Sequence, residues 1–203
     1  MVYLRRLVLA IFSINSPASL PLLNHNYMTE SIDITTTETS TISAIFTSLL
    51  KQVCEETQWE YGEVWLPKTD TILELNPAWY VSSRVKDNRQ VAWAQFWYCS
   101  ESFMLRLGEG LPGRVWETQT SEWIADVSAQ SESYFLRNQI AKAFGAKAGF
   151  GIPIVERNIL AIVVFFMSEV WEQDMEIIAA TEVIVRQYAK CGAGTTLRNE
   201  DEH

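Results

Sequence analysis

The residue types that carry most enzyme chemistry are scarce in this sequence. Among its 203 residues are two histidines, His25 and His203, and both fall in stretches that we expect to be tails. Ser–His and Cys–His nucleophilic catalysis each need an imidazole inside the fold, so neither mechanism is expected. The three cysteines, Cys54, Cys99 and Cys191, are far apart and form no Cys-x-x-Cys pair. They therefore predict neither a disulfide framework nor a zinc site, and they suit a reducing cytoplasm.

One glycine-rich segment matches a nucleotide-binding pattern letter by letter. Residues 108–113 are Gly-Glu-Gly-Leu-Pro-Gly, and in a dinucleotide site such glycines let the backbone approach a pyrophosphate at a helix N-terminus. The context is wrong for that site, because two helices and two strands are expected first and no early strand–loop–helix unit surrounds the segment. We favour a bend that needs positive φ angles. No Gly-Lys-Ser or Gly-Lys-Thr follows, which excludes a Walker-type phosphate loop.

The charge of the chain argues against two classes of partner. The net charge is −9, and the basic residues are scattered. Nucleic-acid binders show a basic face, because neutralising phosphates drives their affinity, and anionic membrane surfaces make the same demand. The densest basic cluster, Arg84, Lys86 and Arg89, is typical of a solvated loop. We therefore expect no nucleic acid and no membrane among the partners.

Hydrophobic spacing indicates the elements that must position any site. Seven apolar residues from Ile42 to Cys54 share one stripe of a helix. Glu172, Asp174 and Glu176 fall in the first turn of the last expected helix, where negative charge complements the helix dipole. The order after the first helix is two strands, a helix, a strand, a helix, two strands and a helix, at residues 59–66, 71–81, 88–104, 123–127, 135–144, 148–155, 158–167 and 172–188. Hairpin pairs instead of alternating crossovers predict an α+β fold, with helices packed on an antiparallel sheet.

The glycine-rich segment and four other stretches together resemble GAF domains, particularly those of cyanobacterial signalling proteins. Gly108–Trp116 looks like the central motif of the family. The stretches that resemble its first strand, its middle strand and its closing hairpin are Trp59–Trp65, Trp123–Val127, Ala148–Ile154 and Leu160–Met167. The resemblance runs from about Ile42 to Ala189, and it depends on the order and spacing of these motifs.

The resemblance implies a GAF-like antiparallel sheet of about six strands, with N- and C-terminal helices packed together. On the other face, loops and a short helix can enclose a ligand; cyclic nucleotides, bilins, haem and small metabolites are among the family's ligand classes. The residues we expect around such a ligand are Trp97, Leu111, Arg114, Trp116, Asp126, Phe135 and Phe150. Core packing is the alternative for the apolar ones. Arg114 and Asp126 could fix a polar ligand, pair with each other or face solvent.

Several subclasses of the family do not fit this sequence. Members that carry a bilin covalently usually supply a cysteine followed by a histidine near a helix that here spans residues 132–145, and Tyr134–Asn138 contains no thiol. Methionine sulfoxide reductases on this fold need a set of cysteines, which Cys54 on a helix stripe, Cys191 in the tail and a single Cys99 do not provide. Haem bound through a histidine is not expected, because the fold contains no internal histidine. Haem bound through a cysteine remains an alternative. The cofactor is left unidentified, with no covalent bilin and no metal predicted.

The domain organisation follows from these boundaries. We expect a flexible N-terminal extension over residues 1–40, one GAF-like domain over residues 41–191 and a C-terminal tail over residues 192–203. Arg5 and Arg6 precede a short apolar run, as in a secretory signal peptide; the other interpretation is an unstructured extension with Met28 as an alternative start. The resemblance to cytoplasmic signalling domains favours the second interpretation and a cytoplasmic location.

Three classes of function stay under consideration. The first is a small-molecule-binding sensory or regulatory domain without catalysis, in which the ligand shifts how the terminal helices pack. The second is a ligand-free dimerisation or protein-docking module, or a fragment of a histidine-kinase-type receptor. Its partner would be a second copy, through the terminal helices, or another signalling protein. The third, an enzyme, has little support without an internal histidine, paired carboxylates, a metal cluster or a phosphate loop.

Overall fold

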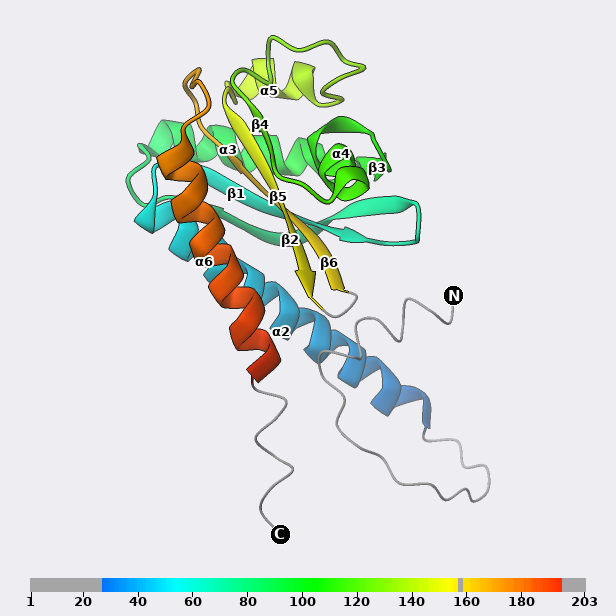
Figure 1. Cartoon of the computed structure of the whole chain (residues 1–203). Coiled ribbons are helices and arrows are strands. Elements are labelled where there is room, and N and C mark those ends of the chain that lie inside the picture. Colours follow the sequence, from blue (N-terminus) through cyan, green and yellow to red (C-terminus); the bar gives the residue numbers. More distant parts are fainter. Residues whose placement is uncertain (1–26, 157–158, 195–203) are drawn as a thin grey trace.

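Six antiparallel strands form a curved sheet at the centre of the molecule (Figure 1). The computed structural model describes residues 27–156 and 159–194. The sheet order is β3-β2-β1-β6-β5-β4. The strands are β1 (Tyr61–Pro67), β2 (Ile72–Val81), β3 (Met104–Arg106), β4 (Glu122–Ile124), β5 (Gly149–Glu156) and β6 (Ile159–Phe166). The antiparallel α+β architecture predicted from the hairpin pattern is confirmed, although the turn expected at residues 156–157 lies partly outside the described residues.

The helices form two layers, one on each face of the sheet. The long terminal helices α2 (Tyr27–Glu56) and α6 (Met175–Gly194) contact each other and cover one face (Figure 1). The shorter helices α3 (Asp87–Ser100), α4 (Gly110–Thr118) and α5 (Asn138–Phe144) cover the other face. Within the described chain, no helix has both the length and the hydropathy needed to cross a membrane.

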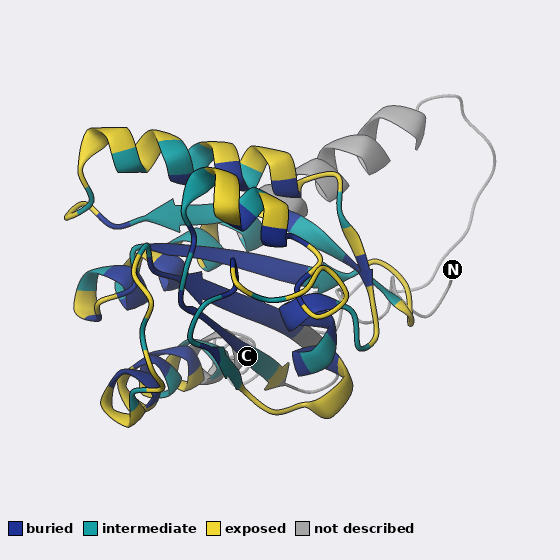
Figure 2. Cartoon of the chain, turned by 90° about the horizontal axis from the view of Figure 1, so that it is seen from above, coloured by how far each residue is buried: buried dark blue, intermediate teal, exposed yellow. Residues whose placement is uncertain are grey.

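Both faces of the sheet are buried, because alternate side chains of each strand point to opposite layers. In β6, Val163 and Phe165 join the core under α2 and α6, whereas Val164 and Phe166 join the core under α3, α4 and α5; all four are 0% exposed. Figure 2 shows the central strands in the buried colour, between helices whose outward sides are exposed. The unbroken apolar sequence of β6 is typical of such a central strand.

Several boundaries differ from the sequence-based expectation, and α4 is not among the helices that the sequence predicts. The first helix begins at Tyr27, so residues 27–40 are helical instead of a flexible extension, and the domain boundary expected at residue 41 falls inside α2. Once a helix is nucleated, each added residue costs little, and serine and threonine lower helix propensity only modestly. The helix expected over 88–104 ends at Ser100, and Met104–Arg106 instead pairs with β2 as a short edge strand. A three-residue strand is too short for a periodic signal.

The glycine-rich segment is the bend that the sequence predicts. Gly108 and Gly110 have φ angles of 78° and 61°, a region that favours glycine. A side chain at Gly113 would overlap the carbonyl oxygen of Arg106, because α4 starts tightly against the end of β3. The segment thus turns the chain from an edge strand into α4, and it does not follow the parallel strand that a dinucleotide site requires.

The irregularity expected around Pro77 is also confirmed. Glu63 of β1 pairs with Trp79 of β2, and Trp65 pairs with Leu75, so β2 carries extra residues between these pairs. Asn76 stabilises the bulge, because its side-chain oxygen accepts a hydrogen bond from the Ala78 amide at 2.9 Å. Proline cannot donate to the strand ladder, so a bulge accommodates it.

The start of α6 yields a first prediction. The helix begins at Met175, so Glu172 precedes it and Asp174 is its N-cap, not a residue of its first turn. The Asp174 carboxylate accepts hydrogen bonds from the amides of Glu176 and Ile177, at 2.9 and 3.2 Å. We expect Asp174→Ala to lower the free energy of unfolding by about 1 kcal/mol in urea denaturation. Asp174→Asn keeps the acceptor and should lose much less; equal losses for both variants would contradict a capping role.

Candidate functional site

The face of the sheet under α3, α4 and α5 is where the resemblance places a ligand. Leu111, Trp116 and Phe135 pack in the core there, with exposed fractions of 0%, 8% and 1%. Trp97 is half-buried at the edge of the same core, where its ring stacks on Trp79 with 5.6 Å between ring centroids. The structure therefore brings these four expected residues to one face. The near-zero exposure of Leu111 and Phe135 shows that other side chains, and no water-sized space, surround them.

Phe150 lies on the opposite face, so the structure does not bring it together with Leu111. Its ring stacks on Trp59 at 6.0 Å, in the core under α2 and α6. Its neighbour Gly151 in β5 faces the other way, because a side chain there would contact Leu111 and Val115. Strand residues alternate between faces, and a shift of one position reverses their side. The motif alone does not say which residues of the strand face which side of the sheet.

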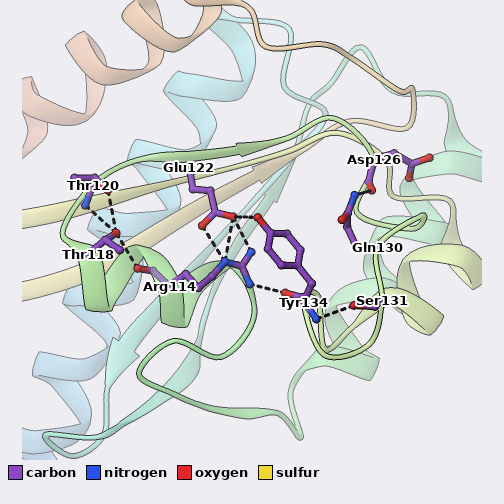
Figure 3. Close-up of polar contacts among 8 residues, drawn as sticks. All are labelled: Arg114, Thr118, Thr120, Glu122, Asp126, Gln130, Ser131 and Tyr134. Atoms are coloured by element: carbon purple, nitrogen blue, oxygen red, sulfur yellow. Dashed lines mark hydrogen bonds and ion pairs between the residues drawn. The ribbon is translucent and has the colours of Figure 1, made fainter.

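Arg114 and Asp126 are not paired with each other, because each has other partners (Figure 3). Arg114 of α4 forms an ion pair with Glu122 of β4, with 2.7 Å between Nη2 and Oε1. Its guanidinium lies 3.8 Å from the ring centroid of Tyr134, whose hydroxyl donates to the same carboxylate at 2.9 Å. This cluster fastens the loop before α5 to α4 and β4.

Asp126 organises the start of that loop. Its carboxylate accepts hydrogen bonds from the amide and hydroxyl of Ser128, at 2.9 and 2.6 Å, and lies 3.4 Å from Nζ of Lys147. Burial by itself raises the pKa of Asp126, but these donors outweigh it and the pKa lies below its usual value. Arg114 and Asp126 thus have structural partners at the two ends of one loop.

A buried ion pair that the sequence analysis missed lies in the core of this face. Glu63 of β1 is 0% exposed, and Arg137, immediately before α5, is 2% exposed. Two nitrogens of Arg137 donate to the two oxygens of Glu63, at 2.5 and 3.1 Å. Trp65 Nε1 and the Tyr61 hydroxyl donate to the same carboxylate at 2.8 and 2.9 Å, and Arg137 also donates to the Ser100 hydroxyl at 2.9 Å. The pair joins β1, α3 and α5.

Aromatic rings surround this pair and exclude water from it. The Arg137 guanidinium lies 5.0–5.6 Å from four ring centroids, those of Trp65, Phe96, Phe135 and Phe166. Burial, followed by the charge of Glu63, raises the pKa of Tyr61 well above its usual value, so the phenol stays protonated and donates. One signal in the sequence could have found the site: a carboxylate inside a strand expected to be buried needs a partner.

An open pocket of about 420 Å³ lies at a different place, where the chain enters β1 and leaves β2 and β6. It contains none of the seven expected ligand residues. Its lining comprises Gln58, Trp59, Glu60, Ser82, Arg84, Val85, Lys86, Asn88, Arg89, Ser168 and Glu169. The basic cluster that the sequence suggested to be a solvated loop therefore forms part of a pocket wall.

Two arginines of that wall hold the ends of helices. Arg84 donates to the carbonyls of Glu55, Cys54 and Thr57, at 2.8, 2.6 and 2.5 Å, where α2 ends. Arg89 donates to the carbonyl of Gly145 at 2.6 Å, at the end of α5. The C-terminal carbonyls of a helix carry partial negative charge, with which such cations interact favourably. The pocket wall is thereby connected to both helix layers.

Solved structures share this fold at low sequence identity. A GAF domain/HD domain protein from Geobacter sulfurreducens has a TM-score of 0.57 at 10% identity, with 78% of this chain and 96% of that chain covered. The GAF domain region of a putative membrane protein from the same species has a TM-score of 0.55 at 14% identity, covering 82% and 99%. A type II free methionine-R-sulfoxide reductase from Thermoplasma acidophilum has a TM-score of 0.54 at 11% identity, covering 77% and 95%.

These similarities identify the fold as that of GAF domains, and at 10–14% identity they identify nothing finer. No protein-family model matches the sequence, and no characterised relative matches it at the sequence level. The predicted GAF-like fold is confirmed. GAF domains and a reductase both appear among the similar structures, so the fold alone does not decide whether the chain catalyses a reaction.

The buried pair generates a second prediction. Arg137→Met leaves the Glu63 carboxylate buried without its cation, and we expect a loss of about 3–5 kcal/mol in the free energy of unfolding. Glu63→Gln combined with Arg137→Met removes both charges, so its loss should be smaller than the sum of the two single losses. Denaturation of the wild type, both single variants and the double variant measures this coupling. Additive losses would contradict an energetic link between the two side chains.

Proposed function

We propose that this chain is a sensory or regulatory domain of the GAF type that binds a small molecule and catalyses no reaction. The observation that carries the proposal is the double role of Arg84. Its side chain forms part of the wall of the 420 Å³ pocket and also holds three carbonyls at the end of α2. A ligand that contacts this wall in one conformation and not in another will shift the position of α2.

A path from the pocket to the second terminal helix is also present. Trp59, another pocket residue, donates from its indole nitrogen to the Thr181 hydroxyl of α6 at 2.9 Å. Ser168 and Glu169 line the pocket and precede α6 in the chain. The pocket lining is thus bonded to α2 through Arg84 and to α6 through Trp59, and these two helices pack against each other.

Of the two cysteines whose side chains the structure describes, Cys54 does not suit thiol chemistry. Cys54 is 0% exposed, and burial raises its pKa far above the usual value, so it stays a protonated thiol. Cys99 is exposed on α3. A thiolate is the reactive form of cysteine, and it needs an exposed and electropositive environment. In the described ranges, no group of three or more His, Cys, Asp or Glu residues is placed to hold a metal.

A docking or dimerisation module is the second candidate, and the outer surface of the terminal helices favours it. Met175, Ala179 and Val183 are exposed at four-residue spacing along α6, with Met175 at 65% and Val183 at 54%. Residues at this spacing share one face of a helix. Ile45 of α2 is 42% exposed. An apolar helix face of this kind suits a second copy of the chain.

The ligand proposal is tested by a thermal-shift screen of the whole chain. We expect at least one compound in a panel of neutral, cationic and anionic metabolites to raise Tm in a saturable way, because a ligand that binds only the folded state stabilises it by mass action. The same compound should alter amide hydrogen exchange at the end of α2 and the start of α6. A panel without a saturable shift in any charge class would overturn the proposal.

The dimer candidate makes an independent prediction. Wild-type protein should sediment as a species of two 23.2-kDa chains, and Val183→Glu should produce monomers, since it buries a charge in the proposed contact. Val170→Glu is the matched control, because Val170 is 57% exposed in the segment before α6 and should leave the dimer intact. A wild-type monomer at high concentration excludes this candidate.

A further inference from the structure

We propose that the pocket beside the end of α2 binds the oxyanion group, carboxylate or phosphate, of a small organic molecule. This inference rests on the proposed function and names the ligand class for it. Three cationic side chains from one stretch of the chain, Arg84, Lys86 and Arg89, line the pocket. They form a local positive cluster on a chain whose net charge is −9. Positive charge concentrated in a concave site attracts anions.

Two of these three cations, Arg84 and Lys86, differ from Lys68, Arg114 and Arg186 in their partners. Lys68, Arg114 and Arg186 each form an ion pair with a carboxylate at 2.7–2.8 Å. Among the described residues, neither Arg84 nor Lys86 has a carboxylate within 4.0 Å. Arg84 is bound to backbone carbonyls, which satisfy its donors and leave its net charge in place. The positive charge of the wall is therefore available to a ligand.

The two carboxylates in the pocket offset only part of this positive charge. Glu60 accepts hydrogen bonds from the Ser168 hydroxyl at 2.6 Å and from Trp93 Nε1 at 3.0 Å, one on each oxygen. Its distance to Arg89 Nε is 3.7 Å, longer than a hydrogen bond. Glu169, the second acidic residue of the lining, is exposed at the surface. The three cations and two carboxylates of the lining leave it with a net charge of 3 − 2 = +1.

Arg89 provides an unused donor at the wall. Its Nε is buried and has no hydrogen-bond partner among the described residues. Buried donors in native proteins are almost always satisfied, by protein or by another molecule. Burial lowers the pKa of Arg89, but an arginine remains charged at neutral pH. Because this nitrogen is covered, a ligand oxygen would reach it only after the surrounding side chains shift, and would then satisfy it with a charge-assisted hydrogen bond.

The size of the pocket suits a metabolite rather than a bare ion. Ligand pockets are commonly about 300–1,000 Å³, and this one, at about 420 Å³, lies in the lower part of that range. The exposed side chains of Lys86 and Asn88 belong to its lining and are free to adjust to a ligand. The pocket therefore has room for an oxyanion and for a short carbon skeleton attached to it.

Isothermal titration of the whole chain tests this inference with four probes at constant ionic strength: succinate, glycerol 3-phosphate, choline and glycerol. We expect saturable binding of succinate or glycerol 3-phosphate and none of choline or glycerol. Tighter binding of glycerol 3-phosphate identifies phosphate as the preferred group, and tighter binding of succinate identifies carboxylate. Lys86→Glu should raise the Kd of the probe that binds about tenfold or more, and a tenfold change corresponds to ~1.4 kcal/mol of binding free energy.

Lys68→Glu is the matched control, because it makes the same charge change at the other end of β1 and should leave Kd within about twofold. If the two variants raise Kd equally, or if neither variant raises it, the pocket is not the binding site. If choline or glycerol binds and neither succinate nor glycerol 3-phosphate does, the oxyanion inference is wrong, but the proposed sensory function is not contradicted. No binding of any probe, together with no hit in the thermal-shift panel, would overturn both.

Discussion

Two opposite charges that have no access to water constrain the whole α3–α5 side of this molecule. A buried carboxylate is tolerated only when a cation and further donors replace the water it has lost. Glu63 receives both from Arg137, Trp65 and Tyr61, and Arg137 is also bound to Ser100 at the end of α3. The pair therefore determines where α5 and the loop before it can lie, and the Arg114 and Asp126 contacts complete the fastening of that loop.

The sheet separates an aromatic core that holds the ion pair from a core covered by the two terminal helices. Under α3, α4 and α5, aromatic rings fill the core around the ion pair. On the other face, α2 and α6 pack on the sheet and on each other, and they lie at the two ends of the described chain. The pocket is located where three segments of chain pass between these layers, before β1, after β2 and after β6. Segments that connect layers are suited to transmit a local change in packing.

A shared fold does not decide between sensing and catalysis here. The similar structures include GAF domains and a methionine-R-sulfoxide reductase, so the choice depends on side chains and not on topology. The buried Cys54 thiol and the exposed Cys99 belong to opposite layers, on α2 and α3. By contrast, Arg84 of the pocket, which has no carboxylate within 4.0 Å among the described residues, is bonded directly to the end of α2. The chemistry of the described residues therefore favours recognition of a ligand.

The sequence by itself determined the fold class, most elements and the bend at Gly108 and Gly110, because periodicity, turn residues and motif order are local properties. It also indicated the irregular stretch at Pro77, for the same reason. Only the tertiary structure decided on which face of the sheet Phe150 lies. The side to which each strand residue points depends on pairing with strands distant in the chain. Glu63 and Arg137 are 74 residues apart, and Arg84 contacts residues nearly 30 positions away. Interactions over such separations leave no local pattern, so the buried pair and the pocket wall emerge only when the chain is folded.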